Sequence, residues 1–306
     1  MMDTERIRGM LLILTASTCW GTTGILQALA PEGAHPLTVG AVRVVAASVV
    51  MLLYMFWKGE SVRALFGKTP LAPLLVTVVG VMGYQFSFFT ALTLTGVSIG
   101  SMIAIGSAPI IAGVLGAVFE REPLSGRWFL STSAAISGCL LLLGGNDSSR
   151  MTIHPRGIAL AFLAAFCYAL LGLGMKRLGA RLKITETATV VTTASLVVGI
   201  PVLVLFDAMW IFSFRGALVS FVLGAFSEAV PMCFFATGLG KVYLRDAYTL
   251  SLAEPLTACF LSALILGERL GVLSYVGAVL IFCGILLLPV SGPDDTELRE
   301  KIMKIS

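Results

Sequence analysis

The sequence predicts an all-α membrane protein with ten transmembrane helices, arranged as two inverted five-helix repeats. Three observations support this fold class. Of the 306 residues, 57% are hydrophobic and only 12% are charged, whereas soluble domains carry about 25% charged residues. Apolar stretches of about 20 residues, enough to cross a hydrocarbon layer about 30 Å thick, recur from end to end. Features of the first half of the chain also reappear in the second half.

The apolar stretches are interpreted as ten spans. They cover residues 9–30, 38–57, 71–92, 97–118, 126–144, 156–175, 187–206, 215–240, 243–266 and 272–290. The first stretch is longer than the apolar region of a signal peptide, and no convincing small-residue cleavage site follows it, so we expect a retained helix. The longest polar segments are 58–70, 145–155 and a short tail at 291–306, which leaves no soluble domain.

The positions of Lys and Arg predict that both termini are cytoplasmic. With the N-terminus inside, sixteen basic residues fall on the cytoplasmic side, and only Arg150, Arg156, Arg215 and Arg269 fall on the other. Basic residues in short loops stay on the cytoplasmic side. The net charge of +4 therefore reflects membrane topology, and no basic cluster indicates nucleic-acid binding.

The internal repeat appears at nearly constant offsets. At 146 residues, Phe88-Phe89 matches Phe234-Phe235, Pro109 matches Pro255 and Glu122 matches Glu268; at 148 residues, Trp20 meets Tyr168. We predict a first repeat at 1–145, a connecting loop at 146–155, a second repeat at 156–290 and a cytoplasmic tail at 291–306. Because five is odd, the second unit enters the membrane from the opposite side, as is common in secondary transporters. Duplication without a mechanistic use is the alternative.

Several motifs resemble a known group. "CWGTTG" at 19–24, Arg43 in the second span, the "AP" and "EP" dipeptides and "GERL" at 267–270 are similar to EamA-type exporters of the drug/metabolite transporter superfamily. The resemblance implies export of amino acids or related metabolites through a cavity lined by the first, third, fourth, sixth, eighth and ninth spans, with the other four outside. Aromatic amino-acid exporters are similar in length and helix count, although no motif selects that branch.

Charged residues within the spans are candidate functional groups, because a charge at the bilayer centre usually faces an interior or a cavity. Glu228 lies near the middle of the eighth span and is expected to bind the ammonium group of an amino acid or a coupling proton; a structural role is the alternative. Glu254 is a candidate for coupling or gating, or for satisfying backbone donors near a kink. Arg43 is expected near the outer end of its span, snorkelling toward headgroups, with Glu32 and Glu186 as conceivable partners.

Prolines mark candidate hinges, because each lacks an N–H and frees the carbonyl four residues earlier. This applies to Pro109, Pro255 and Pro231, for which helix packing is the alternative. Aromatic and polar side chains are expected to line the cavity, and they are equally suited to packing or lipid contact. These candidates are Trp20, Tyr84, Gln85, Phe88, Tyr168, Met232 and Phe235, with Ser101 as a donor to a carboxylate.

The function predicted from these observations is secondary active transport by alternating access, exporting amino acids or similar small metabolites across a bacterial inner membrane. A proton-coupled importer or a channel for small polar solutes are alternatives. The sequence contains no P-loop, so nothing in it indicates ATP-driven transport. It also shows no nucleophile with a positioned base, which an intramembrane enzyme would need. The histidines are not spaced as metal ligands. The six cysteines lie within spans and predict no disulfide framework. We expect no cofactor, and a small-molecule substrate, the lipid bilayer and protons as candidate partners; no motif names the substrate.

Overall fold

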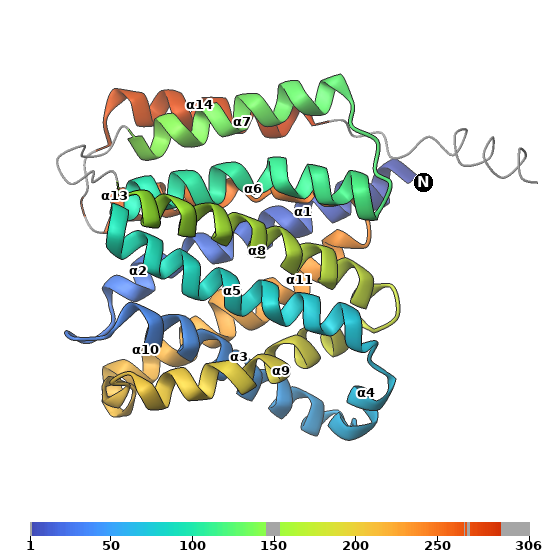
Figure 1. Cartoon of the computed structure of the whole chain (residues 1–306), viewed down its shortest axis with the longest axis vertical. Helices are drawn as coiled ribbons and strands as arrows, with labels where there is room; N and C mark the ends of the chain where they lie inside the picture. Colours follow the sequence, from blue (N-terminus) through green and yellow to red (C-terminus); the bar gives the residue numbers. More distant parts are fainter. Residues whose placement is uncertain (1, 145–153, 266, 268–269, 289–306) are drawn as a thin grey trace, which may run out of the picture.

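The computed structural model describes residues 2–144, 154–265, 267 and 270–288, and these residues form helices and short connections (Figure 1). The predicted repeat partner Glu268, most of the connecting loop and the tail at 291–306 lie outside the described residues. The first half contains α1 (Met2–Gly21), α2 (Thr23–Ala28), α3 (Pro36–Trp57), α4 (Val62–Lys68), α5 (Leu71–Thr95), α6 (Val97–Phe119) and α7 (Gly126–Gly144).

The second half has the same succession of long helices, with more interruptions. It contains α8 (Pro155–Gly179), α9 (Ile184–Leu205), η2 (Met209–Phe212), α10 (Phe214–Gly224), the π-helical turn η3 (Ala225–Ala229), α11 (Val230–Leu239), α12 (Leu244–Leu250), α13 (Ala253–Ile265) and α14 (Val272–Leu287). The eighth predicted span thus comprises α10, η3 and α11, and the ninth comprises α12 and α13.

The helices have the length and the surface expected of a membrane protein. Nine helical segments among the described residues are long and apolar enough to cross a bilayer. The tenth predicted span appears as the shorter apolar helix α14, of 16 residues. Large apolar side chains such as Phe56, Val204 and Phe282 are exposed on the outside, while many hydroxyl and charged side chains are buried. This distribution suits a hydrocarbon solvent.

Two histidines begin helices in the same way. His35 precedes Pro36 and accepts a hydrogen bond on Nδ1 from the backbone N–H of Leu37, at 3.3 Å. His154 precedes Pro155 and accepts on Nδ1 from the N–H of Gly157, also at 3.3 Å. Proline suits the first helical position because the N–H it lacks would have no helical partner there. Both histidines therefore serve as helix caps.

The main helix contacts join the two halves. Helix α5 packs along α8, α1 along α11, α3 along α9, α6 against α12, and α7 along α14. If the halves are exchanged span for span, this set of pairs maps onto itself. Helices α7 and α14 lie at one end of the long axis, and α3, α9 and α10 lie at the other (Figure 1).

The contact between α5 and α8 is close because of a glycine. A Cβ added at Gly80 would lie 2.5 Å from the backbone nitrogen of Leu171, which is nearer than real Cβ atoms approach. Small residues allow helix backbones to pack closely in membranes. At Gly24, by contrast, no atom of another segment lies within 4 Å of the corresponding position, so this glycine is not needed for close helix packing.

Candidate functional site

Three spans lose their regular helical backbone around one cavity. The first span breaks between α1 and α2, directly after Trp20 and Gly21. The eighth contains the π-helical turn η3, which carries Glu228. The ninth is interrupted between α12 and α13, and Glu254 lies in the first turn of α13. Irregular backbone at membrane depth is tolerated where it is buried in protein or lines a cavity, and π turns occur frequently at functional sites.

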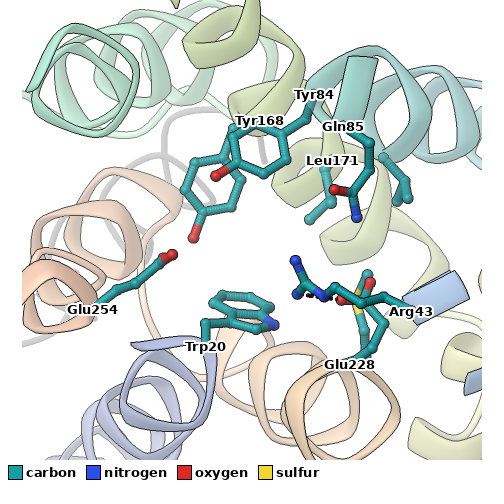
Figure 2. Close-up of a pocket in the computed structure, with 10 residues that line it drawn as sticks. Trp20, Arg43, Tyr84, Gln85, Tyr168, Leu171, Glu228 and Glu254 are labelled. Carbon is teal, nitrogen blue, oxygen red and sulfur yellow. Dashed lines mark hydrogen bonds and ion pairs between the residues drawn. The ribbon is translucent and has the colours of Figure 1, made fainter. Parts of the chain in front are cut away.

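The cavity brings together side chains from both halves of the chain (Figure 2). The lining residues are Trp20 from α1, Arg43 from α3, Val81, Tyr84 and Gln85 from α5, Tyr168 and Leu171 from α8, Glu228 from η3, Met232 from α11 and Glu254 from α13. Most of them are buried. An aromatic and apolar wall with a few polar groups is typical of a small-molecule site.

An ion pair forms one side of the cavity. Arg43 Nη2 donates to Glu228 Oε2 at 2.6 Å, and only 7% of Arg43 and 3% of Glu228 are exposed. The same nitrogen donates to the carbonyl of Ser227 at 3.0 Å. That carbonyl lacks its usual helical donor because Pro231, four residues later, has no N–H. The proline and the arginine are therefore complementary, since one exposes an acceptor and the other supplies a donor.

Glu254 lies across the cavity from this ion pair (Figure 2). Its side chain is partly buried and makes no hydrogen bond or ion pair within the described part of the chain. Its backbone N–H donates to the carbonyl of Ser251 at 2.9 Å, which satisfies the acceptor that Pro255 leaves free. The first turn of a helix favours a negative charge because unpaired N–H groups point toward it. The helix break thus positions a carboxylate without giving it a cationic partner.

Aromatic rings separate the two acidic groups. The ring centroids of Tyr84 and Tyr168 lie 5.0 Å apart, and those of Trp20 and Tyr168 lie 6.1 Å apart with an edge-to-face angle of 73°. The tyrosine hydroxyl groups point into the cavity (Figure 2). The hydroxyl of Tyr168 and the amide oxygen of Gln85 are buried and have no hydrogen-bond partner of ordinary geometry in the described part of the chain. Trp20 and Tyr168 occupy equivalent positions in the sequence repeat.

Seven of the thirteen predicted site residues line the cavity: Trp20, Tyr84, Gln85, Tyr168, Glu228, Met232 and Glu254. Phe88 stacks on Tyr84 with a centroid distance of 5.1 Å, and Phe235 contacts the Trp20 ring at 5.0 Å, so both support the aromatic wall from behind.

The remaining predicted site residues lie elsewhere. Ser101 is buried on α6, and Pro109 lies inside the uninterrupted α6 helix. Pro231 lies in the first turn of α11, and Pro255 in the first turn of α13.

The structure corrects two expectations. Arg43 is buried and paired with Glu228, so the predicted position near the headgroups, with Glu32 or Glu186 as a partner, is wrong. Glu186 instead accepts from Lys68 at 2.7 Å. The second span therefore contributes to the cavity, whereas the fourth span, α6, supplies none of its lining residues. Desolvation explains the first correction, because a guanidinium this deep is stable only with buried acceptors.

The cavity is small in this conformation. Its volume is about 30 Å³, and about 10–15 Å³ measured in this way holds one water molecule. Two waters would fill it, whereas drug-sized ligands occupy pockets of about 300–1,000 Å³. A solute of even modest size can therefore enter only if the surrounding helices move apart.

A second buried charged cluster lies where α6 and α8 end and α12 begins. Glu122 accepts from Lys176 Nζ at 2.5 Å and from the backbone N–H of Leu244 at 2.7 Å. Nearby, Arg6 Nη2 donates to Asp246 at 2.5 Å. These bonds tie α1, the α6–α7 connection, α8 and α12 together at one end of the molecule.

Comparison with known proteins identifies the family. Two segments of the chain, residues 7–144 and 155–289, match the EamA-like transporter family. The chain belongs to this family.

Relatives of this EamA-like chain support the assignment. It is 38% identical over 279 residues to a protein named "Uncharacterized transporter YwfM" from Bacillus subtilis, covering 91% of this chain and 92% of the relative. It is 23% identical to "Uncharacterized inner membrane transporter YicL" from Salmonella typhimurium, over 93% and 96% of the two chains. A crystal structure with a TM-score of 0.78 and 17% sequence identity covers 91% of this chain and 95% of that one, which shows a shared fold.

Sequence reasoning missed three lining residues of this EamA-like protein, namely Arg43, Val81 and Leu171. A signal for Arg43 existed, because an arginine deep in an apolar span requires an acceptor and the acidic residues in neighbouring spans include Glu228. Nothing distinguished Val81 and Leu171 from the many other apolar residues, since only the packing of α5 on α8 turns them inward.

Proposed function

We propose that this EamA-like protein is a secondary active transporter that exports amino acids or related small metabolites by alternating access through the central cavity. We also propose that both termini lie in the cytoplasm and that the membrane is the bacterial inner membrane. The EamA-like family and the transporter names of its relatives support the general class. Export, the substrate class and the mechanism are our own extension.

One observation carries the proposal. Charged groups from the two halves, Arg43 in the first and Glu228 and Glu254 in the second, meet in a buried cavity where spans are interrupted. Burying charge in a bilayer is costly, and none of this charge is needed to hold long apolar helices in lipid. Transporter sites commonly lie near the bilayer midplane, between repeats and at discontinuous helices.

The pairing of helices suggests how access alternates. The contacts between the halves map onto themselves when the halves are exchanged, so the halves can trade conformations at little cost. In the conformation described here, bonds through Glu122 and Asp246 fasten the end that we place in the cytoplasm. Release of these bonds would open the cavity to the cytoplasm, and tilting of the helix pairs α5–α6 and α11–α13 would change its access.

The test is counterflow in proteoliposomes. Purified full-length protein is loaded with unlabelled members of a panel of amino acids, amines, nucleosides and sugars, and uptake of the labelled solute is followed. We expect saturable counterflow for one class. The matched control is the double variant Arg43→Gln/Glu228→Gln, which removes both charges of the buried ion pair at once. Absence of counterflow for every class would contradict the carrier proposal.

The alternatives give different outcomes in the same system. Unsaturated flux without counterflow would indicate a channel. Accumulation driven by an inward proton gradient, with protein inserted in one known orientation, would indicate a proton-coupled importer rather than the proposed exporter.

A further inference from the structure

We infer that the substrate is an organic cation, and that Glu254 with its aromatic neighbours binds the ammonium group. This inference rests on the transport function proposed above and narrows its substrate class to amines or amino-acid derivatives with a net positive charge. It also moves the expected ammonium site from Glu228 to Glu254.

The charges that line the cavity do not balance. Among its ten lining residues, Arg43 is the single cation, and Glu228 and Glu254 are the acidic side chains. One positive and two negative charges give a net charge of −1 when both carboxylates are ionised. Arg43 and Glu228 bond to each other at 2.6 Å, so the uncompensated charge belongs to Glu254. A cation is the ligand that would balance it.

Each kind of substrate would leave a different net charge in the cavity. Arg43 bonds to Glu228 and to the carbonyl of Ser227 through Nη2 alone, so the other guanidinium N–H groups could still meet a carboxylate. An anion would then make the net charge of the cavity −2 and a zwitterion would leave it at −1, whereas a cation would bring it to zero. Because uncompensated buried charge is costly, a cation is the favoured ligand.

Aromatic side chains form the cavity wall beside Glu254. Trp20, Tyr84 and Tyr168 surround the space in front of Glu254 (Figure 2). Aromatic faces attract ammonium groups through their negative quadrupole, and cages of such rings bind alkylated ammonium ions. The buried hydroxyl of Tyr168 and the buried amide oxygen of Gln85 offer acceptors for ammonium N–H donors, because neither has a hydrogen-bond partner of ordinary geometry in the described residues.

The experiment uses four probes with one ring and different charges: 2-phenylethylamine, phenylalanine, 3-phenylpropionate and 2-phenylethanol. Binding of labelled 2-phenylethylamine to the full chain in lipid nanodiscs is measured by scintillation proximity, with the other three as competitors. We expect the amine to bind best, the zwitterion more weakly, and the anion and the alcohol least. Glu254→Gln should weaken amine binding by about 30-fold or more, because a buried charge partner is lost, while competition by the alcohol stays the same.

Controls separate loss of charge from loss of folding. Glu32→Gln makes the same substitution at an exposed position outside the cavity and should leave amine binding unchanged. Glu254→Asp keeps the charge but holds it farther from the ligand, so it should weaken amine binding less than Glu254→Gln does and leave alcohol binding unchanged. If Glu254→Gln does not fold, this smaller loss, confined to the amine, carries the test.

The outcomes distinguish this inference from the proposed function. Preferred binding of the anion, equal binding of all four probes, absence of saturable amine binding, or an amine affinity unchanged in Glu254→Gln would overturn it. Counterflow of neutral or anionic solutes alone would do the same and leave the transport function standing. Absence of counterflow for every class would remove the transport function itself.

Discussion

Removing one partner of the Arg43–Glu228 ion pair should destabilise the protein strongly, and removing both should cost no more than removing one. The donor and acceptor atoms are 2.6 Å apart, and the exposed side-chain fractions are 9% and 4%. Loss of one partner from a buried pair costs about 3–5 kcal/mol, because the other charge stays buried without compensation. We therefore expect a loss of about that size in the free energy of unfolding for Glu228→Gln and for Arg43→Gln.

The double variant measures the coupling free energy between the two side chains. With both charges gone, neither side chain is left as an unpaired ion, so Arg43→Gln/Glu228→Gln should cost about as much as one single variant. The coupling free energy would then be about 3 kcal/mol, well above the 0.3–0.5 kcal/mol error of additivity for independent sites. The loss of unfolding free energy for Glu228→Gln should lie at the lower end of this range, because the Ser227 carbonyl still accepts a hydrogen bond from the Arg43 guanidinium at 3.0 Å.

The assay is equilibrium unfolding of the purified chain in mixed micelles, with the four members of the cycle compared at one lipid composition. Glu254→Gln serves as a contrasting variant in the same cavity. It removes a carboxylate with no bonding partner among the described residues, so it should not lower stability. Additive single effects, with the double variant about 6 kcal/mol or more below wild type, would refute our account of the pair.

Three further predictions concern the fold and its orientation. Glu122→Gln should speed hydrogen exchange of the α12 backbone by about tenfold or more, since a hydrogen bond to a charged group contributes about 1.5–3 kcal/mol; unchanged exchange measured by mass spectrometry would contradict a fastening role. Gly80→Ala should cost about 1–3 kcal/mol by overpacking, while Gly24→Ala, with no atom near the added methyl group, should be neutral or slightly stabilising in the same unfolding assay. Cysteines at His35 and Lys183, both exposed, should react with a membrane-impermeant reagent from opposite sides, and labelling of both from one side would overturn the topology.

The sequence determined the features that depend on one segment at a time. Span lengths follow from apolar runs, and helix starts follow from pairs such as His35-Pro36. The disturbance near Glu228 was signalled by Pro231, because a missing N–H weakens the helix wherever it packs. The polar character of the cavity also followed, since a carboxylate in an apolar span must face an interior. For these reasons most of the expected aromatic and acidic lining residues do line the cavity.

Only the tertiary structure decided which of these groups meet. Arg43 and Glu228 are 185 residues apart, and their pairing depends on the rotation of α3 relative to η3, which is set by helix packing. The same is true of α6, which was expected to line the cavity and supplies none of its lining residues. Hydrophobicity specifies that a segment lies in the membrane, but it is almost unchanged when a helix rotates about its axis. Close contacts such as Gly80 on Leu171 set that rotation, and they exist only when the halves are assembled.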